Sequence, residues 1–192
     1  TIKTLGNKYV GHLPSQSEKT ALNVGRGLTS PIFFIDELAF LYNNRIMLAA
    51  ALPATTAARA KQKIKNEPYG VVMTTTAGKL DDRDGKFAYE LIEESAKWSE
   101  KFFDTDNEEN LEETVRLNSP GRVSTVYCVF NHRQLGYTDE WLAETIEKAR
   151  SSGEDMLRDF FNKWTSGTQS HPLSVEVLEK IRASEIIDPP YT

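Results

Sequence analysis

Two adjacent carboxylates follow a short apolar segment in the first quarter of the chain. Residues 32–35 read Ile-Phe-Phe-Ile, and Asp36 and Glu37 come directly after them. A run of this length is too short for a helix and is typical of a buried parallel strand, at whose carboxyl end ligands of α/β sheets bind. An aspartate there can hold Mg²⁺ through its oxygens. The next residue, pointing the other way out of the strand, can orient or deprotonate a water that attacks a phosphate.

A second apolar segment ends in three hydroxyl groups. Val71, Val72 and Met73 are followed by the triplet 74–76, which is Thr-Thr-Thr. The interval between the two segments leaves room for one helical crossover, so we expect two parallel and adjacent strands. Hydroxyl groups beside a strand that binds Mg²⁺ lie where a γ-phosphate or its attacking water would sit. The two segments together indicate a Walker B strand and the polar strand tip of a nucleotide-hydrolysing motor.

Both features also have a purely structural explanation. Asp36 could cap a following helix by accepting from its amide groups, with Glu37 facing water. The hydroxyl groups of residues 74–76 could simply close the end of a strand by local hydrogen bonds. For the two acids alone this explanation stays open, and the threonine triplet favours phosphate chemistry.

The composition is that of an ordinary globular protein, with 192 residues, 39% hydrophobic and 27% charged. A net charge of −5 argues against a protein that grips DNA with its whole surface, and we interpret the basic stretch 59–65 as a solvated helix face. No apolar stretch approaches the about 20 residues that span a bilayer, so no membrane partner is expected. Cys128 is the single cysteine and the three histidines are isolated in sequence, which excludes an internal disulfide and argues against zinc chemistry.

The remaining pattern predicts mostly helices. After the acids we expect one helix from Asn43 or Asn44 to Ala51 and a second from Pro53 to about Lys65. Further along, the apolar spacing predicts helices over 87–98, 141–149, 156–164 and 174–183, and a strand over 122–130.

The sequence resembles a known protein family. The motifs that carry the resemblance are, in chain order, Leu13-Pro14-Ser15, Gly25-Arg26-Gly27, residues 32–37 with Leu38-Ala39-Phe40, and residues 72–78. Their order is similar to that of the large terminase subunits of tailed bacteriophages, the ATPases that pump viral DNA into capsids. Residues 8–80 match by definite motifs. Residues 120–192 match only in general character, like the small helical subdomain that precedes the family's nuclease domain.

The resemblance implies a fold and a role for each site residue. The fold would be α/β: part of a P-loop ATPase core of the additional-strand, RecA-like kind, with parallel strands, followed by a small, mostly helical subdomain. Asp36 would be the Mg²⁺ ligand and Glu37 the catalytic carboxylate. Thr74, Thr75 and Thr76 would form the coupling motif that links hydrolysis to movement. Arg26 matches a basic position ahead of the Walker B strand and is a possible nucleotide or coupling contact; a solvated loop charge is the equal alternative.

The family also implies cofactors and partners. The cofactors would be Mg²⁺ and ATP. The partners would be double-stranded DNA, the portal protein, the small terminase subunit and other copies of the chain in a ring, all in the cytoplasm of the infected bacterial host.

In one respect the sequence departs from the family pattern. The phosphate-binding loop G-x-x-x-x-G-K-[S/T] and the acidic cluster of the nuclease domain are absent from these residues. We therefore expect the central piece of a terminase, inactive by itself. Residues 1–118 would be the C-terminal half of the ATPase core, 119–187 the linking subdomain, and 188–192, with Asp188-Pro189-Pro190, the start of a linker.

Two other interpretations stay open. Another additional-strand ATPase, such as a helicase of the Asp-Glu-x-x type, would share the carboxylates and the polar strand tip, but should show arginine-rich motifs that residues 120–192 lack. A non-catalytic interaction module would instead dock a partner through Trp141, Phe160, Phe161 and Trp164, although such aromatic residues are more often part of a core.

Overall fold

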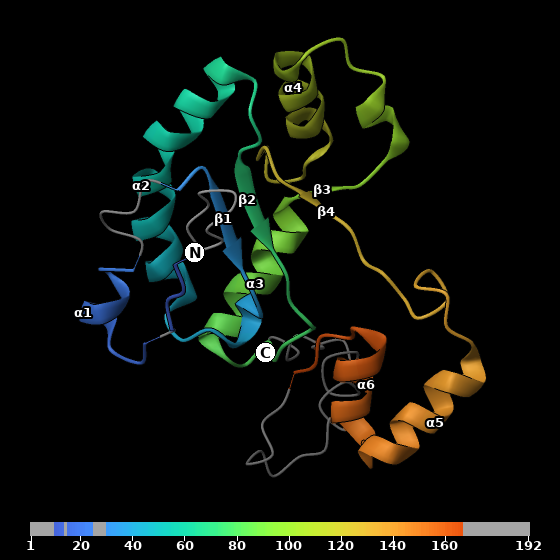
Figure 1. The fold of residues 1–192 in the computed structure, drawn as a ribbon. Coiled ribbons are helices and arrows are strands. Elements are labelled where there is room, and N and C mark those ends of the chain that lie inside the picture. The colour runs from blue at the N-terminus through green and yellow to red at the C-terminus, as the bar shows by residue number, and fades with distance from the viewer. Residues whose placement is uncertain (1–9, 14, 25–29, 167–192) are drawn as a thin grey trace, which may run out of the picture.

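A computed structural model describes residues 10–13, 15–24 and 30–166 of the chain (Figure 1). The elements of this part are α1 (Glu18–Ala21), β1 (Ile32–Ile35), η1 (Leu38–Phe40), α2 (Asn44–Lys65), β2 (Gly70–Met73), α3 (Arg83–Glu94), β3 (Ala96–Lys97), η2 (Glu100–Phe103), α4 (Glu108–Asn118), β4 (Val126–Tyr127), α5 (Asp139–Ala149) and α6 (Gly153–Phe161). The chain therefore mixes helices and strands, in agreement with an α/β class. Within these ranges no helix has the length and apolar character needed to cross a membrane.

The strands of the described residues form two separate two-stranded sheets, both parallel. In the first, Ile32 of β1 lies opposite Gly70 of β2, and Ile35 lies opposite Met73. This confirms the predicted parallel pair of neighbouring strands, with α2 as the crossover between them. In the second sheet β3 pairs with β4, so the predicted strand over 122–130 is reduced to two residues.

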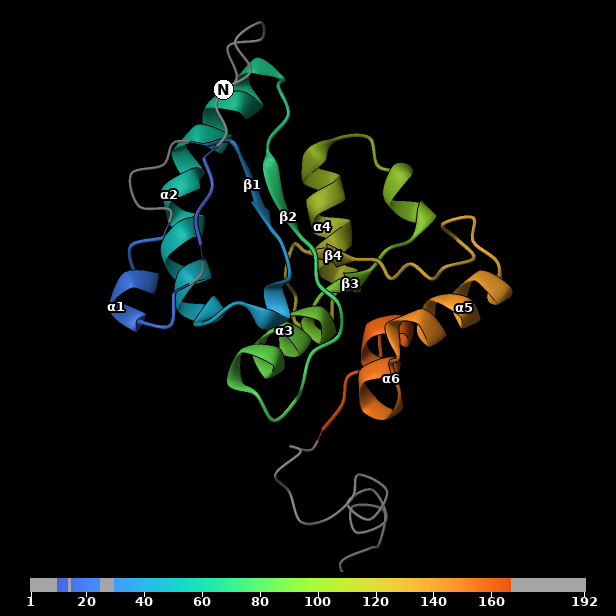
Figure 2. The same ribbon diagram turned by 60° about the horizontal axis from the view of Figure 1, so that its bottom comes forward.

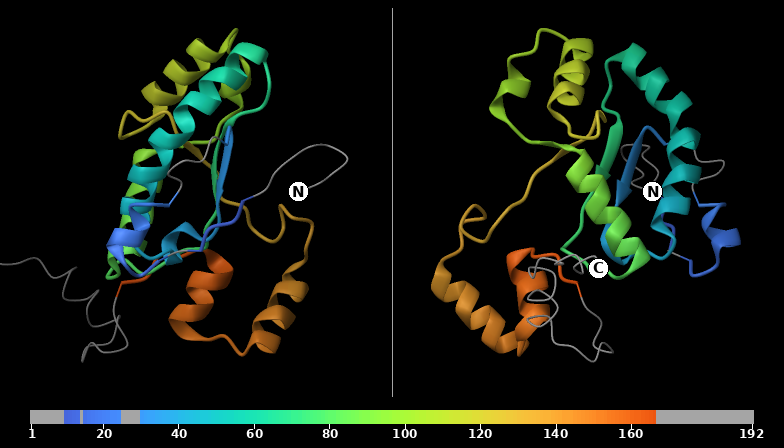
Figure 3. Two further views of the ribbon diagram at one scale, coloured as in Figure 1. Left: turned by 60° about the vertical axis from the view of Figure 1, so that its left-hand side comes forward. Right: turned by 180° about the vertical axis from the view of Figure 1, so that it is seen from behind.

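The helices cover one face of the β1–β2 sheet. Figure 3 shows α2 and α3 on the same side of the two strands. Because side chains alternate along a strand, the residues that pack on these helices are every second one: Phe33, Ile35, Val71 and Met73. The opposite face carries Ile32, Phe34 and Val72, which are 51%, 52% and 51% exposed. The expectation of a fully buried strand is therefore wrong for the described part of the chain, since its helices cover one face.

Helix α2 is a single helix of 22 residues with Pro53 inside it, where the sequence predicts two. A proline in a helix lacks one amide donor and crowds the preceding turn, which favours a break. Here Ala51 and Thr55, on either side of Pro53, are almost completely buried. Packing of both halves against the core offsets the local cost.

Other boundaries shift for similar reasons. The helix predicted over 87–98 is α3, which ends at Glu94, because Ala96 and Lys97 pair with β4. Ser119 Oγ and the Gly121 amide both donate to the Glu94 carbonyl, which joins the chain after α4 to the end of α3. The division at 118/119 stays a prediction. Residues 174–183 and 188–192 lie outside the described residues.

Candidate functional site

The two carboxylates and the threonine triplet meet at the carboxyl ends of β1 and β2. Thr74 Oγ1 donates to Asp36 Oδ1 at 2.6 Å. The amide and the hydroxyl of Thr76 lie 3.4 and 3.3 Å from Glu37 Oε2, to which both donate. The hydroxyl groups of one strand tip thus contact the acids of the other. Both acids are exposed to solvent, so a ligand can reach them.

The middle threonine supports the backbone of the turn after the acids. Thr75 Oγ1 accepts from the Ala39 amide at 3.0 Å and donates to the Thr76 carbonyl at 2.8 Å. The Leu38 amide donates to the Thr74 carbonyl at 3.0 Å. Five of the six predicted site residues therefore belong to one hydrogen-bonded network. The sixth, Arg26, lies outside the described residues.

Glu37 has an unusual backbone conformation. Its φ of 52° and ψ of 48° place it in the left-handed region, which costs a residue other than glycine about 1–2 kcal/mol. β1 ends at Ile35, so strand alternation does not set the direction of the Glu37 side chain, contrary to expectation. Strain of this kind persists where neighbouring contacts leave no other choice, and it concentrates at functional sites.

Hydrogen bonds of Asn44 and Asp84 tie the turn after Glu37 to the starts of α2 and α3. The Asn44 side-chain amide donates to the carbonyls of Leu38 and Asp84 at 3.0 and 2.8 Å. The Asp84 carboxylate accepts from the backbone amides of Asn43 and Asn44 at 3.0 and 3.2 Å. Asp84 thereby caps α2, a role that the sequence assigns to Asn43 or Asn44. The Asn43 side chain instead donates to the carbonyls of Ser15 and Gln16, at 3.0 Å each.

Sequence reasoning missed both of these supporting residues. Asn44 carries a weak signal, because it is a polar residue at the first position of a helix that packs on the core. Asp84 stands beside Asp81 and Asp82 in a polar segment, and composition alone does not select one of the three. Its distance from α2 in sequence hides the contact.

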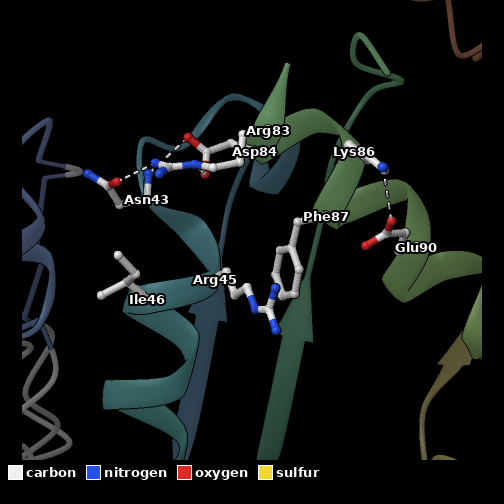
Figure 4. Close-up of a pocket in the computed structure, with 8 residues that line it drawn as sticks. All are labelled: Asn43, Arg45, Ile46, Arg83, Asp84, Lys86, Phe87 and Glu90. Atoms are coloured by element: carbon white, nitrogen blue, oxygen red, sulfur yellow. Dashed lines mark hydrogen bonds and ion pairs between the residues drawn. The ribbon is translucent and has the colours of Figure 1, made fainter. Parts of the chain in front are cut away.

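A hollow of about 300 Å³ lies between the first turns of α2 and α3. Figure 4 shows its lining, which is Asn43, Arg45, Ile46, Arg83, Asp84, Lys86, Phe87 and Glu90. Arg83 pairs with Glu18 at 3.4 Å, and Lys86 lies 3.8 Å from Glu90. Two of its three cationic groups are thus engaged, and the lining includes none of the six predicted site residues.

The chemistry of the donors fits a magnesium site that depends on a nucleotide. Within the described ranges, no group of three or more histidine, cysteine, aspartate or glutamate side chains could hold a metal. Mg²⁺ commonly takes one or two carboxylates and completes its shell with water and substrate phosphates. Asp36, with the Thr74 hydroxyl beside it, offers such a partial shell. The sequence contains no Walker A loop, the segment that binds the phosphates in nucleotide sites of this kind.

The chain was compared with protein-family models, with curated proteins and with solved structures. None of them matches it.

Proposed function

We propose that this chain is part of an ATP-hydrolysing motor of the large terminase type, which translocates viral double-stranded DNA into a procapsid. The observation that carries the proposal is the pair of carboxylates at the end of β1, hydrogen-bonded to the hydroxyl groups at the end of the parallel strand β2. This pairing joins a metal ligand, a water-activating group and a polar strand tip in one network. Chain order and spacing of the motifs agree with that family.

Each residue then has a defined task. Asp36 would hold Mg²⁺, which would supply positive charge to neutralise the phosphate oxygens. Glu37 orients the attacking water and accepts its proton, and Thr76 fixes the direction of that carboxylate. Thr74 joins the metal ligand to the neighbouring strand, and Thr75 joins that strand to the turn. A change at the phosphate end is thereby passed to β2, as expected of a coupling motif.

The partners follow from the same proposal. DNA, the portal protein, the small terminase subunit and further copies of the chain would assemble around the motor in the host cytoplasm. Because the chain has a net charge of −5, its DNA contacts would be confined to local basic surfaces. Arg26 stays a candidate contact for nucleotide or for coupling.

One observation favours the interaction module as a second candidate. Tyr137 and Trp141 stack with ring centroids 4.1 Å apart and are 46% and 41% exposed. Of the aromatic residues named from sequence, Trp141 and Phe161 are exposed, whereas Trp164 packs against the core. A partner surface at the first helix of the α5–α6 pair is therefore compatible with the structure. The helicase alternative gains no support from it.

Nucleotide binding separates these candidates. Mg²⁺-ATP binding should be measured by calorimetry on this chain, and on the chain joined to an upstream polypeptide that carries a Walker A loop. We expect binding only in the second case, and its loss when Asp36→Asn is introduced. Equal absence of binding in both would overturn the motor proposal and favour the interaction module.

A further inference from the structure

The chain just after α6 lies against the loop that follows the threonine triplet. The Leu80 amide donates to the Thr165 carbonyl at 2.8 Å, and the Thr165 amide donates to the Gly78 carbonyl at 3.4 Å. Lys79 and Thr165 form an isolated parallel β-bridge, so Thr165 pairs with the loop as one residue of a neighbouring strand. Figure 2 shows the chain leaving α6 and running towards the loop between β2 and α3. Segments far apart in sequence are thus joined two residues from the site.

The Trp164 ring lies next to Gly78 of the same loop. A Cβ atom added to Gly78 would lie 3.1 Å from the Trp164 ring and 3.0 Å from the Ala39 side chain. Gly78 is therefore sandwiched between the turn after the acids and the indole, and no larger residue fits without a shift. The indole also packs edge-on against Tyr89 of α3, with ring centroids 5.4 Å apart.

This contact leads directly to the carboxylate site. The backbone amide of Ala39, whose side chain a Cβ on Gly78 would meet, donates to Thr75 Oγ1. The turn that contains Ala39 follows the strained residue Glu37. One short path of contacts therefore runs from Trp164 through Gly78 and Ala39 to the threonine triplet and to Glu37.

The same contact also attaches the segment after the last two described helices to the core. Between residues 139 and 166, the buried residues are Leu142 and Thr165, each 8% exposed. Trp164 packs against the main core cluster, whereas α6 has no buried residue of its own. A displacement of the α5–α6 pair would therefore act on the loop at residues 78–80.

We propose that Trp164 and Thr165 are positioning residues that hold the threonine triplet and the Glu37 turn in register, and thereby connect α5 and α6 to the site. The inference rests on the proposed function for its catalytic consequence. Its structural part, a dependence of the Glu37 turn on Trp164, stands apart from any activity.

Amide hydrogen exchange by NMR on this chain tests the structural part. Trp164→Ala should accelerate exchange of the Leu38 and Ala39 amides about tenfold, because their acceptors belong to the threonine triplet. Trp164→Phe should retain most of the protection. Trp141→Ala is the matched control, since Trp141 stacks on Tyr137 away from this path, and it should leave both amides unchanged.

The amides of Asn43 and Asn44, bonded to Asp84, report whether the fold is intact. If Trp164→Ala accelerates them equally, Trp164→Leu provides the same comparison in a milder form. Unchanged protection at Leu38 and Ala39 in folded Trp164→Ala or Trp164→Leu would overturn the inference.

Turnover tests the catalytic part in the chain supplied with its Walker A portion. Trp164→Ala should lower kcat about tenfold and leave KM for ATP within about twofold, since the geometry that it disturbs serves the transition state. A changed KM with unchanged kcat would overturn this part. If Glu37→Gln has no effect on hydrolysis, the proposed function fails, and the exchange result still decides the structural part.

Discussion

At the scale of single residues, Glu37 combines a solvent-exposed carboxylate, a strained backbone and two hydrogen bonds from Thr76. Glu37→Gln keeps the shape of the side chain and removes the proton acceptor. In the chain supplied with a Walker A loop we expect turnover to fall by about 10²–10⁴-fold, with ATP binding largely retained. Steady-state hydrolysis and equilibrium binding measure the two effects. Near-normal hydrolysis would return Glu37 to a structural role.

The left-handed backbone of Glu37 has a consequence for stability. Glu37→Gly removes the steric cost of this conformation, and we expect it to be more stable than Glu37→Gln by up to about 1 kcal/mol. Both variants lack the carboxylate, so the comparison between them isolates the backbone strain. Denaturant unfolding measures the difference. Equal stability, or a less stable glycine variant, would show that the turn carries little strain.

The sequence predicts the meeting of the acids and threonines because short apolar runs indicate strands, and parallel neighbouring strands bring their carboxyl ends to one edge of a sheet. It does not predict the conformation of Glu37, since backbone dihedral angles in a turn depend on contacts made elsewhere. The Leu38 carbonyl, for example, is held by Asn44, which in turn bonds to Asp84. Only the folded chain brings these residues together.

At the scale of elements, Asp84 joins the start of α3 to the start of α2. Its carboxylate satisfies two backbone amides that α2 would otherwise leave without acceptors. Asp84→Ala should therefore lower the free energy of unfolding by about 2 kcal/mol. Glu93→Ala, at an exposed position of α3, is the control and should have little effect. A loss for Asp84→Ala as small as for the control would contradict the capping role.

The start of α5 carries a pH-dependent contact. Hydrogen bonds from Arg133 and then His132 lower the pKa of the Asp139 carboxyl well below its ordinary value. Arg133 Nε lies 2.8 Å from Asp139 Oδ1, and His132 Nε2 lies 2.7 Å from the same oxygen. Because the pKa is lowered in the folded chain, the stabilisation is present above the ordinary aspartate pKa and is lost as the pH falls through the folded pKa.

NMR titration of the Asp139 carboxyl should therefore show it ionised at pH values where aspartates without such hydrogen bonds are protonated. Arg133→Gln removes the larger cause and should raise the pKa towards the ordinary value. An unchanged titration in that variant would assign the effect to His132 instead.

The elements themselves are predicted unevenly, for physical reasons. Helices α5 and α6 form where the apolar spacing predicts helices, but α6 covers Gly153–Phe161 instead of the predicted 156–164. The break at Pro53 does not occur, because tertiary packing of Ala51 and Thr55 outweighs a local preference. The two residues of β3 carry no periodic signal, and they pair with β4, which follows only after α4 in the chain.

At the scale of the whole molecule, the two-stranded β1–β2 sheet resembles part of a larger sheet. Parallel sheets are normally covered on both faces, and two strands alone are marginally stable. Among the described residues the face with Ile32, Phe34 and Val72 stays exposed, and β1 and β2 pair only with each other. This supports the proposal that further strands and a Walker A loop complete the motor core.

An exposed apolar face beside unpaired strand edges favours association with another chain. We therefore expect this polypeptide, by itself, to self-associate in a concentration-dependent way and to hydrolyse ATP at no more than background rate. Sedimentation velocity measures the first property. Phe34→Lys should reduce association because it places a charge in the middle of the exposed face, opposite Val72.

Phe103→Lys is the matched control for this experiment. Phe103 is 78% exposed and belongs to η2, away from the β1–β2 sheet. If both lysine variants reduce association equally, loss of any exposed aromatic side chain is sufficient and the sheet face is not the contact. Under the proposed function, addition of an upstream polypeptide with a Walker A loop should both suppress association of the unmodified chain and raise hydrolysis above background, because one docking event would complete the sheet and supply the phosphate cradle. A monomeric chain with robust Mg²⁺-dependent ATPase activity of its own would contradict both expectations.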